Sequence, residues 1–103
     1  MKVLALYKRA IEELGLRQLD VYRVRDEKGV EKDIVRIFDP ASVRVITVDL
    51  GAIREALKPT EYLGKIFEAL DNAGIPYPER KANELMEAFR RLEKPEAEAA
   101  GQA

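Results

Sequence analysis

Arginines, lysines and aromatic rings are the side chains of this sequence that could do chemistry, and one set of them lies between positions 22 and 44. Rings on a β-sheet can stack on bases, and guanidinium or ammonium groups beside them can hold phosphates. We therefore predict a surface for nucleic acid, preferably single-stranded, because unpaired bases leave their faces open for stacking. Its candidate residues are Tyr22, Arg23, Arg25, Lys28, Lys32, Arg36, Phe38 and Arg44.

The composition argues against most enzymatic chemistry. The chain of 103 residues has no histidine and no cysteine, so the usual zinc sites, cysteine nucleophiles and histidine bases are absent. Its glycines are isolated from one another, so there is no glycine-rich phosphate loop. We expect a small non-catalytic binding module that needs no cofactor and no metal.

Two carboxylates leave one catalytic alternative. Asp39 and Asp49 end the second and third expected strands, where they could share a divalent cation such as Mg²⁺. Each also has a simpler role, since Asp39 can begin a turn and Asp49 can cap a helix. A metal-dependent, nuclease-like enzyme is therefore our remote alternative.

All the candidate nucleic-acid residues lie in the stretch from residue 19 to residue 50, which alone has the alternation and β-branched content of strands. The pattern predicts strands over residues 19–25, 30–38 and 43–48. A loop of residues 27–29, with Gly29 at positive φ, would join the first two strands. The facing pairs would then be Arg25 with Glu31, Arg23 with Asp33, Val21 with Val35, Asp20 with Arg36, and Leu19 with Ile37.

This register would partly neutralise the strand arginines. A solvated sheet face of ion pairs is therefore the alternative to a nucleic-acid surface. Lys28, Lys32 and Arg44 are the cations without an evident carboxylate partner.

Helices are predicted over residues 2–14, 50–58, 61–73 and 79–93 from their apolar spacing and end signals. Strands grouped together and flanked by helices indicate an α+β domain, in the order αβββααα. We expect a three-stranded, mainly antiparallel sheet, made of a hairpin and a third strand, with helices on one face. Residues 1–94 would form this single domain, and residues 95–103 a flexible Ala/Glu-rich tail.

The alternative function is a protein-interaction or homodimerisation module that uses an apolar helix stripe. Tyr7 on the first helix, or Phe89 on the last, would then face another chain. Changing Arg36 and Arg44 to Glu would separate the two hypotheses, because only nucleic-acid binding needs these cations.

Residues 66–92 also allow a helix-turn-helix reading. The second helix of that motif enters the major groove with its N-terminal residues. Here that end offers Arg80, Lys81 and Asn83, but Glu84 and Glu87 would repel phosphates. An ordinary helical hairpin packed on a sheet is the simpler interpretation.

Bulk properties set the remaining limits. The formal net charge is −1, from 18 basic and 19 acidic residues, so any attraction for a polyanion must be local. The lack of cysteine fits a cytoplasmic protein, and no segment approaches the length of a membrane span. Abundant Lys, Arg and Glu with few thermolabile residues indicate a thermophilic source.

Overall fold

The computed structural model describes the backbone of residues 3–102 and the side chains of residues 4–93. The predicted start of the first helix at Lys2 lies outside the described residues. The elements, in chain order, are α1 (Val3–Glu13), β1 (Arg17–Arg25), β2 (Glu31–Asp39), β3 (Arg44–Asp49), the short 3₁₀ helix η1 (Arg54–Ala56), α2 (Pro59–Ala73) and α3 (Glu79–Gln102).

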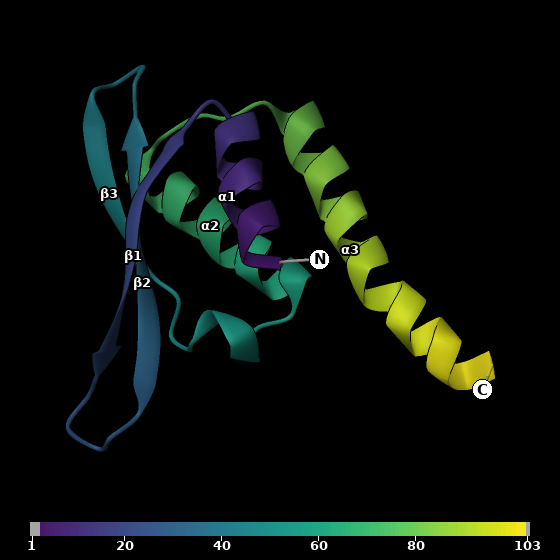
Figure 1. The fold of residues 1–103 in the computed structure, drawn as a ribbon. Coiled ribbons are helices and arrows are strands. Elements are labelled where there is room, and N and C mark those ends of the chain that lie inside the picture. The colour runs from purple at the N-terminus through teal and green to yellow at the C-terminus, as the bar shows by residue number, and fades with distance from the viewer. Residues whose placement is uncertain (1–2, 103) are drawn as a thin grey trace.

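The three strands form one antiparallel sheet in the order β1-β2-β3, with the helices on the same side of it (Figure 1). Helix α1 contacts β1, α2 contacts β3, and α3 packs on α2. We call the side with the helices the inner face of the sheet and the opposite side the outer face. None of the described helices covers the outer face (Figure 1). The α+β class is confirmed.

The predicted hairpin register is confirmed from Asp20 opposite Arg36 to Arg25 opposite Glu31. Gly29 has φ +84°, as the three-residue loop requires. The predicted pairing of Leu19 with Ile37 is wrong, because a bulge between Gln18 and Asp20 shifts the register. A bulge of this kind bends the strand in which it lies. Leu16, the residue just before β1, is buried in the core.

The expected helix over residues 50–58 is also wrong, since only Arg54–Ala56 are helical and form a 3₁₀ turn. The chain after β3 instead continues to pair with β2. The Leu50 amide donates to the Asp33 carbonyl, and the Asp33 amide donates to the Ala52 carbonyl, both at 3.1 Å. The Leu50 amide and the Ala52 carbonyl therefore bond to β2 and are not available for hydrogen bonds within a helix. Residues 3–102 therefore contain three α-helices rather than the four predicted.

Two helix boundaries differ from the predictions. Helix α2 begins at Pro59 rather than at residue 61, and Lys58 is its N-cap. Proline suits the first helical turn because its missing N–H would be unpaired there. Helix α3 continues past residue 93 and through Pro95 to Gln102, since the alanines and glutamates that follow have high helix propensity. The flexibility of this tail stays a prediction.

An aromatic cluster joins the three helices. The rings of Tyr7 and Tyr62 stack with centroids 3.8 Å apart, and the Phe89 ring lies 5.8 Å from Tyr7. Tyr7 is 2% and Phe89 4% exposed. The expectation that either ring faces another chain is therefore wrong, because both are covered within this chain. None of the helices in residues 3–102 is long and apolar enough to cross a membrane.

Candidate nucleic-acid interface

The strand pairing decides which candidate residues share a face. Val21, Val35 and Val48 lie opposite one another and belong to the core, so they mark the inner face. Alternate residues point to the other side. The outer face thus carries Arg17, Asp20, Tyr22 and Val24 from β1, Lys32, Ile34, Arg36 and Phe38 from β2, and Val45, Thr47 and Asp49 from β3.

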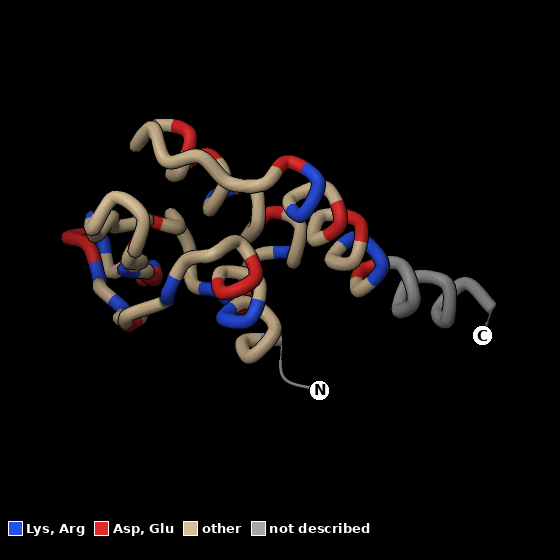
Figure 2. The backbone as a smooth tube through the Cα atoms, turned by 90° about the horizontal axis from the view of Figure 1, so that it is seen from above, with Lys and Arg blue, Asp and Glu red and all other residues tan. Residues whose placement is uncertain are grey.

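The eight predicted site residues are therefore divided. Four of them lie on the outer face: Tyr22, Lys32, Arg36 and Phe38. Three lie on inner-face positions: Arg23, Arg25 and Arg44. Lys28 lies in the β1–β2 turn. Basic and acidic residues are interspersed along the chain rather than gathered on one side (Figure 2).

Two ion pairs cross the outer face. The Arg36 guanidinium donates from Nε and Nη2 to the two Asp20 carboxylate oxygens, at 2.8 and 2.5 Å. These hydrogen bonds lower the pKa of Asp20 and raise the pKa of Arg36. The Lys32 ammonium donates to Asp49 Oδ2 at 2.5 Å and lowers the pKa of Asp49.

The expectation that Lys32 lacks a carboxylate is therefore wrong. Asp49 faces Ile34 across the β2–β3 pair, which brings its side chain beside Lys32. Asp49 belongs to β3, so the pairing of β1 with β2 in the hairpin could not predict this contact.

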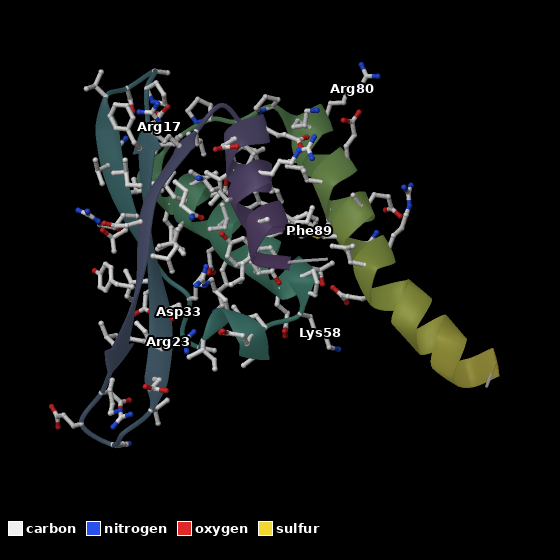
Figure 3. The ribbon with its side chains drawn as sticks, in the orientation of Figure 1. Arg17, Arg23, Asp33, Lys58, Arg80 and Phe89 are labelled. Atoms are coloured by element: carbon white, nitrogen blue, oxygen red, sulfur yellow. The ribbon has the colours of Figure 1, made fainter. Side chains whose placement is uncertain are left out.

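The end of the outer face that carries Phe38 has a positive charge that no ion pair neutralises among the described side chains. Phe38 is flanked by Arg17 on β1 and Val45 on β3, and Arg44 follows next along the strand edge. Among the side chains of residues 4–93, neither Arg17 nor Arg44 has an ion-pair partner. Arg17 lies at the opposite end of the sheet from Arg23 (Figure 3).

Arg17 was missed by the sequence reasoning. The predicted strand began two residues later, and the bulge that brings Arg17 opposite Phe38 leaves no signal such as a glycine. Strand alternation extended backwards from Tyr22 would not have found it, because a bulge changes the alternation.

Arg23 is part of a structural cluster on the inner face instead of a binding surface. Its guanidinium donates to Asp33 Oδ1 at 2.7 Å and to Glu55 at 2.8 Å. Asp33 is 1% exposed and also accepts from the Arg54 amide at 2.8 Å and from Arg54 Nε at 3.1 Å. Figure 3 places Arg23 and Asp33 together near one end of the sheet.

The hydrogen bonds in this cluster outweigh burial and hold the pKa of Asp33 at about 2, well below its ordinary range. The hydrogen bond to Asp33 raises the pKa of Arg23. The partner Arg54 comes from η1, far from Asp33 in the sequence, so no local pattern indicates it. Arg25 likewise has a partner, donating to Glu31 at 3.2 Å.

Asp39 and Asp49 do not come together. Asp39 faces Arg44 at one end of the β2–β3 pair, whereas Asp49 faces Ile34 at the other end. Asp39 accepts from the Ser42 hydroxyl at 2.6 Å within its own turn. In the described residues, no group of three or more Asp or Glu side chains could hold a metal ion. The strand-end pair therefore cannot bind one cation jointly.

The cations at the start of α3 lie near carboxylates. Arg80 Nε lies 3.5 Å from Glu84, and the Lys81 ammonium lies 3.6 Å from both Glu84 and Glu13. Arg80 extends away from the helices into solvent (Figure 3). These pairs weaken the positive potential that a groove-binding helix would need.

Comparison with protein-family models, with curated proteins and with solved structures finds no match to this chain. The outer face offers two aromatic rings, two ion pairs and a cationic end.

Proposed function

We propose that the protein binds single-stranded nucleic acid on the outer face of its sheet. The observation that carries this proposal is the end of the outer face where the Phe38 ring lies between Arg17 and Val45, with the Arg17 guanidinium free of an ion-pair partner among the side chains of residues 4–93. A ring can stack on a base while neighbouring guanidinium groups contact phosphates. No described helix competes for this face.

Tyr22 supplies a second platform on the same face, and it is 45% exposed. It faces Ile34, which lies four residues from Phe38 on β2, or about 13 Å along a strand. An unpaired strand can place one base on each ring. A duplex keeps its bases paired and stacked, so it cannot use both platforms.

The charges on the outer face predict that base stacking contributes more to binding than phosphate contacts do. Arg17, Lys32 and Arg36 are offset by Asp20 and Asp49, which leaves a small positive excess. We expect about one phosphate contact, made by Arg17, and hence a log–log salt slope of only about −0.7. Two stacked bases at about 1–3 kcal/mol each supply about 2–6 kcal/mol, which corresponds to dissociation constants between about 40 μM and about 30 mM.

The test is fluorescence anisotropy with labelled single-stranded and duplex oligonucleotides at two salt concentrations. Phe38→Leu keeps an apolar side chain but removes the ring, and it should weaken single-strand binding by about fivefold or more. Arg17→Gln should weaken binding and flatten the salt dependence. Arg80→Gln, which makes the same charge change on exposed α3, is the matched control and should bind as the wild type does.

Three results would overturn the proposal. The first is no single-strand binding at low salt. The second is equal binding of duplex and single strand. The third is a loss on Arg80→Gln as large as that on Arg17→Gln, which would move the site to α3 and favour the helix-turn-helix interpretation.

A further inference from the structure

The two edges of the sheet are unlike each other. The β1 edge has a bulge and alternates charged with other residues, including Arg17, Asp20 and Arg23. Charges and bulges at an edge hinder pairing with another chain. The β3 edge runs through residues 45–48 (Val-Ile-Thr-Val) with no charge, no proline and no bulge. Residues 45–48 of the β3 edge, between Arg44 and Asp49, therefore lack these protections.

The backbone groups along that edge are available for pairing. The Leu50 amide bonds to β2, at 3.1 Å from the Asp33 carbonyl. In an antiparallel ladder the hydrogen-bonding direction alternates, so Val48 and Ile46 also face β2 while Val45 and Thr47 face outward. No backbone hydrogen bond joins Val45 or Thr47 to a turn or loop of residues 3–102.

A groove of about 390 Å³ lies beside this edge, between β3 and α2. Ile46 and Val48 line its strand side, and the small side chains of Ala69 and Ala73 line its helix side. A strand added to β3 would direct alternate side chains into this groove. The groove therefore suits an extended segment with β-branched or other apolar residues at those positions.

We propose that this segment is β3 of a second copy of the chain, paired antiparallel about a two-fold axis. In that arrangement Ile46 and Val48, which line each copy's own groove, lie next to the inner-face residues of the other copy's β3, and residues 45–48 carry no charge that would oppose the contact. Such a contact is closed and uses the same patch on both chains.

Charges on the groove wall fit the same partner. Lys65 and Glu68 lie one turn apart on α2 and line the groove. Two α2 helices related by the two-fold axis run antiparallel, so Lys65 of one copy can face Glu68 of the other. The pairing would join two three-stranded sheets into one of six strands, with both outer faces on one side. It does not depend on the nucleic-acid proposal.

Analytical ultracentrifugation of the whole chain over a range of concentrations tests this proposal. The wild type should show a reversible monomer–dimer equilibrium. Thr47→Pro removes the outward amide without removing a β2 hydrogen bond, because proline is tolerated on the open side of an edge strand. It should weaken dimerisation at least tenfold. Thr47→Ala keeps the amide and should dimerise as the wild type does.

Amide hydrogen exchange of the wild type gives a second reading if Thr47→Pro does not fold. The Val45 and Thr47 amides should become protected as the concentration rises, while the Val21 and Arg23 amides on the β1 edge should not. A monomer at every concentration would overturn the proposal, and a peptide from another protein would then be the alternative partner for the β3 edge. A dimer without protection at Val45 and Thr47, or a folded Thr47→Pro that still dimerises, would also overturn it.

Discussion

Replacing Asp33 with asparagine should destabilise the fold far more than the same change at an exposed ion pair. Asp33 Oδ2 accepts from Arg23 Nη2 at 3.1 Å, from the Arg54 amide at 2.8 Å and from Arg54 Nε at 3.1 Å. If the asparagine NH₂ group took the place of Oδ2, a hydrogen-bond donor would face these three donors and none of the three bonds could form. Turning the amide over would instead lose the 2.7 Å bond from Arg23 Nε. Neither orientation of asparagine satisfies the cluster.

The expected magnitude follows from burial. Removing one partner of a buried charge cluster costs about 3–5 kcal/mol. The Arg23 side chain keeps 37% and the Arg54 side chain 19% of its exposure, so water can recover part of that loss. We expect about 3 kcal/mol for Asp33→Asn. For a domain of this size this loss corresponds to a fall of about 12–24 °C in melting temperature.

Asp20→Asn is the matched control. Asp20 also accepts two hydrogen bonds from one arginine, but its side chain is 46% exposed. Exposed ion pairs contribute little to stability, so this variant should melt close to the wild type. Urea and thermal unfolding followed by circular dichroism measure both variants. Equal losses at Asp33 and Asp20 would refute the argument from burial.

The same cluster predicts a pH dependence. The Asp33 pKa is about 2 in the folded chain, against an ordinary value of 3.8. A lowered pKa adds stability above pH 3.8, and this stability is lost as the pH falls toward 2. The difference corresponds to about 2 kcal/mol. The stability gap between wild type and Asp33→Asn should narrow over this window, and a gap unchanged down to pH 2 would contradict the lowered pKa.

Four further outcomes can be measured by unfolding. Val43 is 75% exposed and has φ +54°, so Val43→Asn should raise stability in urea by about 1 kcal/mol because asparagine tolerates this conformation. A Cβ added by Gly29→Ala meets no atom within 4 Å, so this variant should lose about 1 kcal/mol of stability only because alanine is strained at a φ of +84°. Phe89→Ala should cost about 3–5 kcal/mol without changing the oligomeric state, whereas the partner-interface hypothesis for Phe89 predicts the reverse. The wild type should melt above about 65 °C if the composition reflects a thermophilic source.

The sequence by itself determined the local features of this protein. Alternation located three strands, and opposite charges predicted the hairpin register from Asp20–Arg36 to Arg25–Glu31. Gly29 identified the turn. These features depend on residues that are close along the chain, whose contacts follow from strand periodicity and turn geometry alone.

Only the tertiary structure decided which face of the sheet the helices cover. Alternation places Tyr22 and Arg23 on opposite faces, but helix packing put Arg23 on the covered side, and the bulge brought Arg17 to Phe38. Arg54 reaches Asp33 from a loop 21 positions away.

The third strand and the segment after it were also decided by distant contacts. β3 supplies Asp49 as the partner of Lys32, although the two are 17 positions apart. Residues 50–52 pair with β2 instead of forming a helix, because Asp33 offers both its amide and its carbonyl to that segment. Contacts between residues distant in the sequence form only when the layers assemble, and no local pattern encodes them.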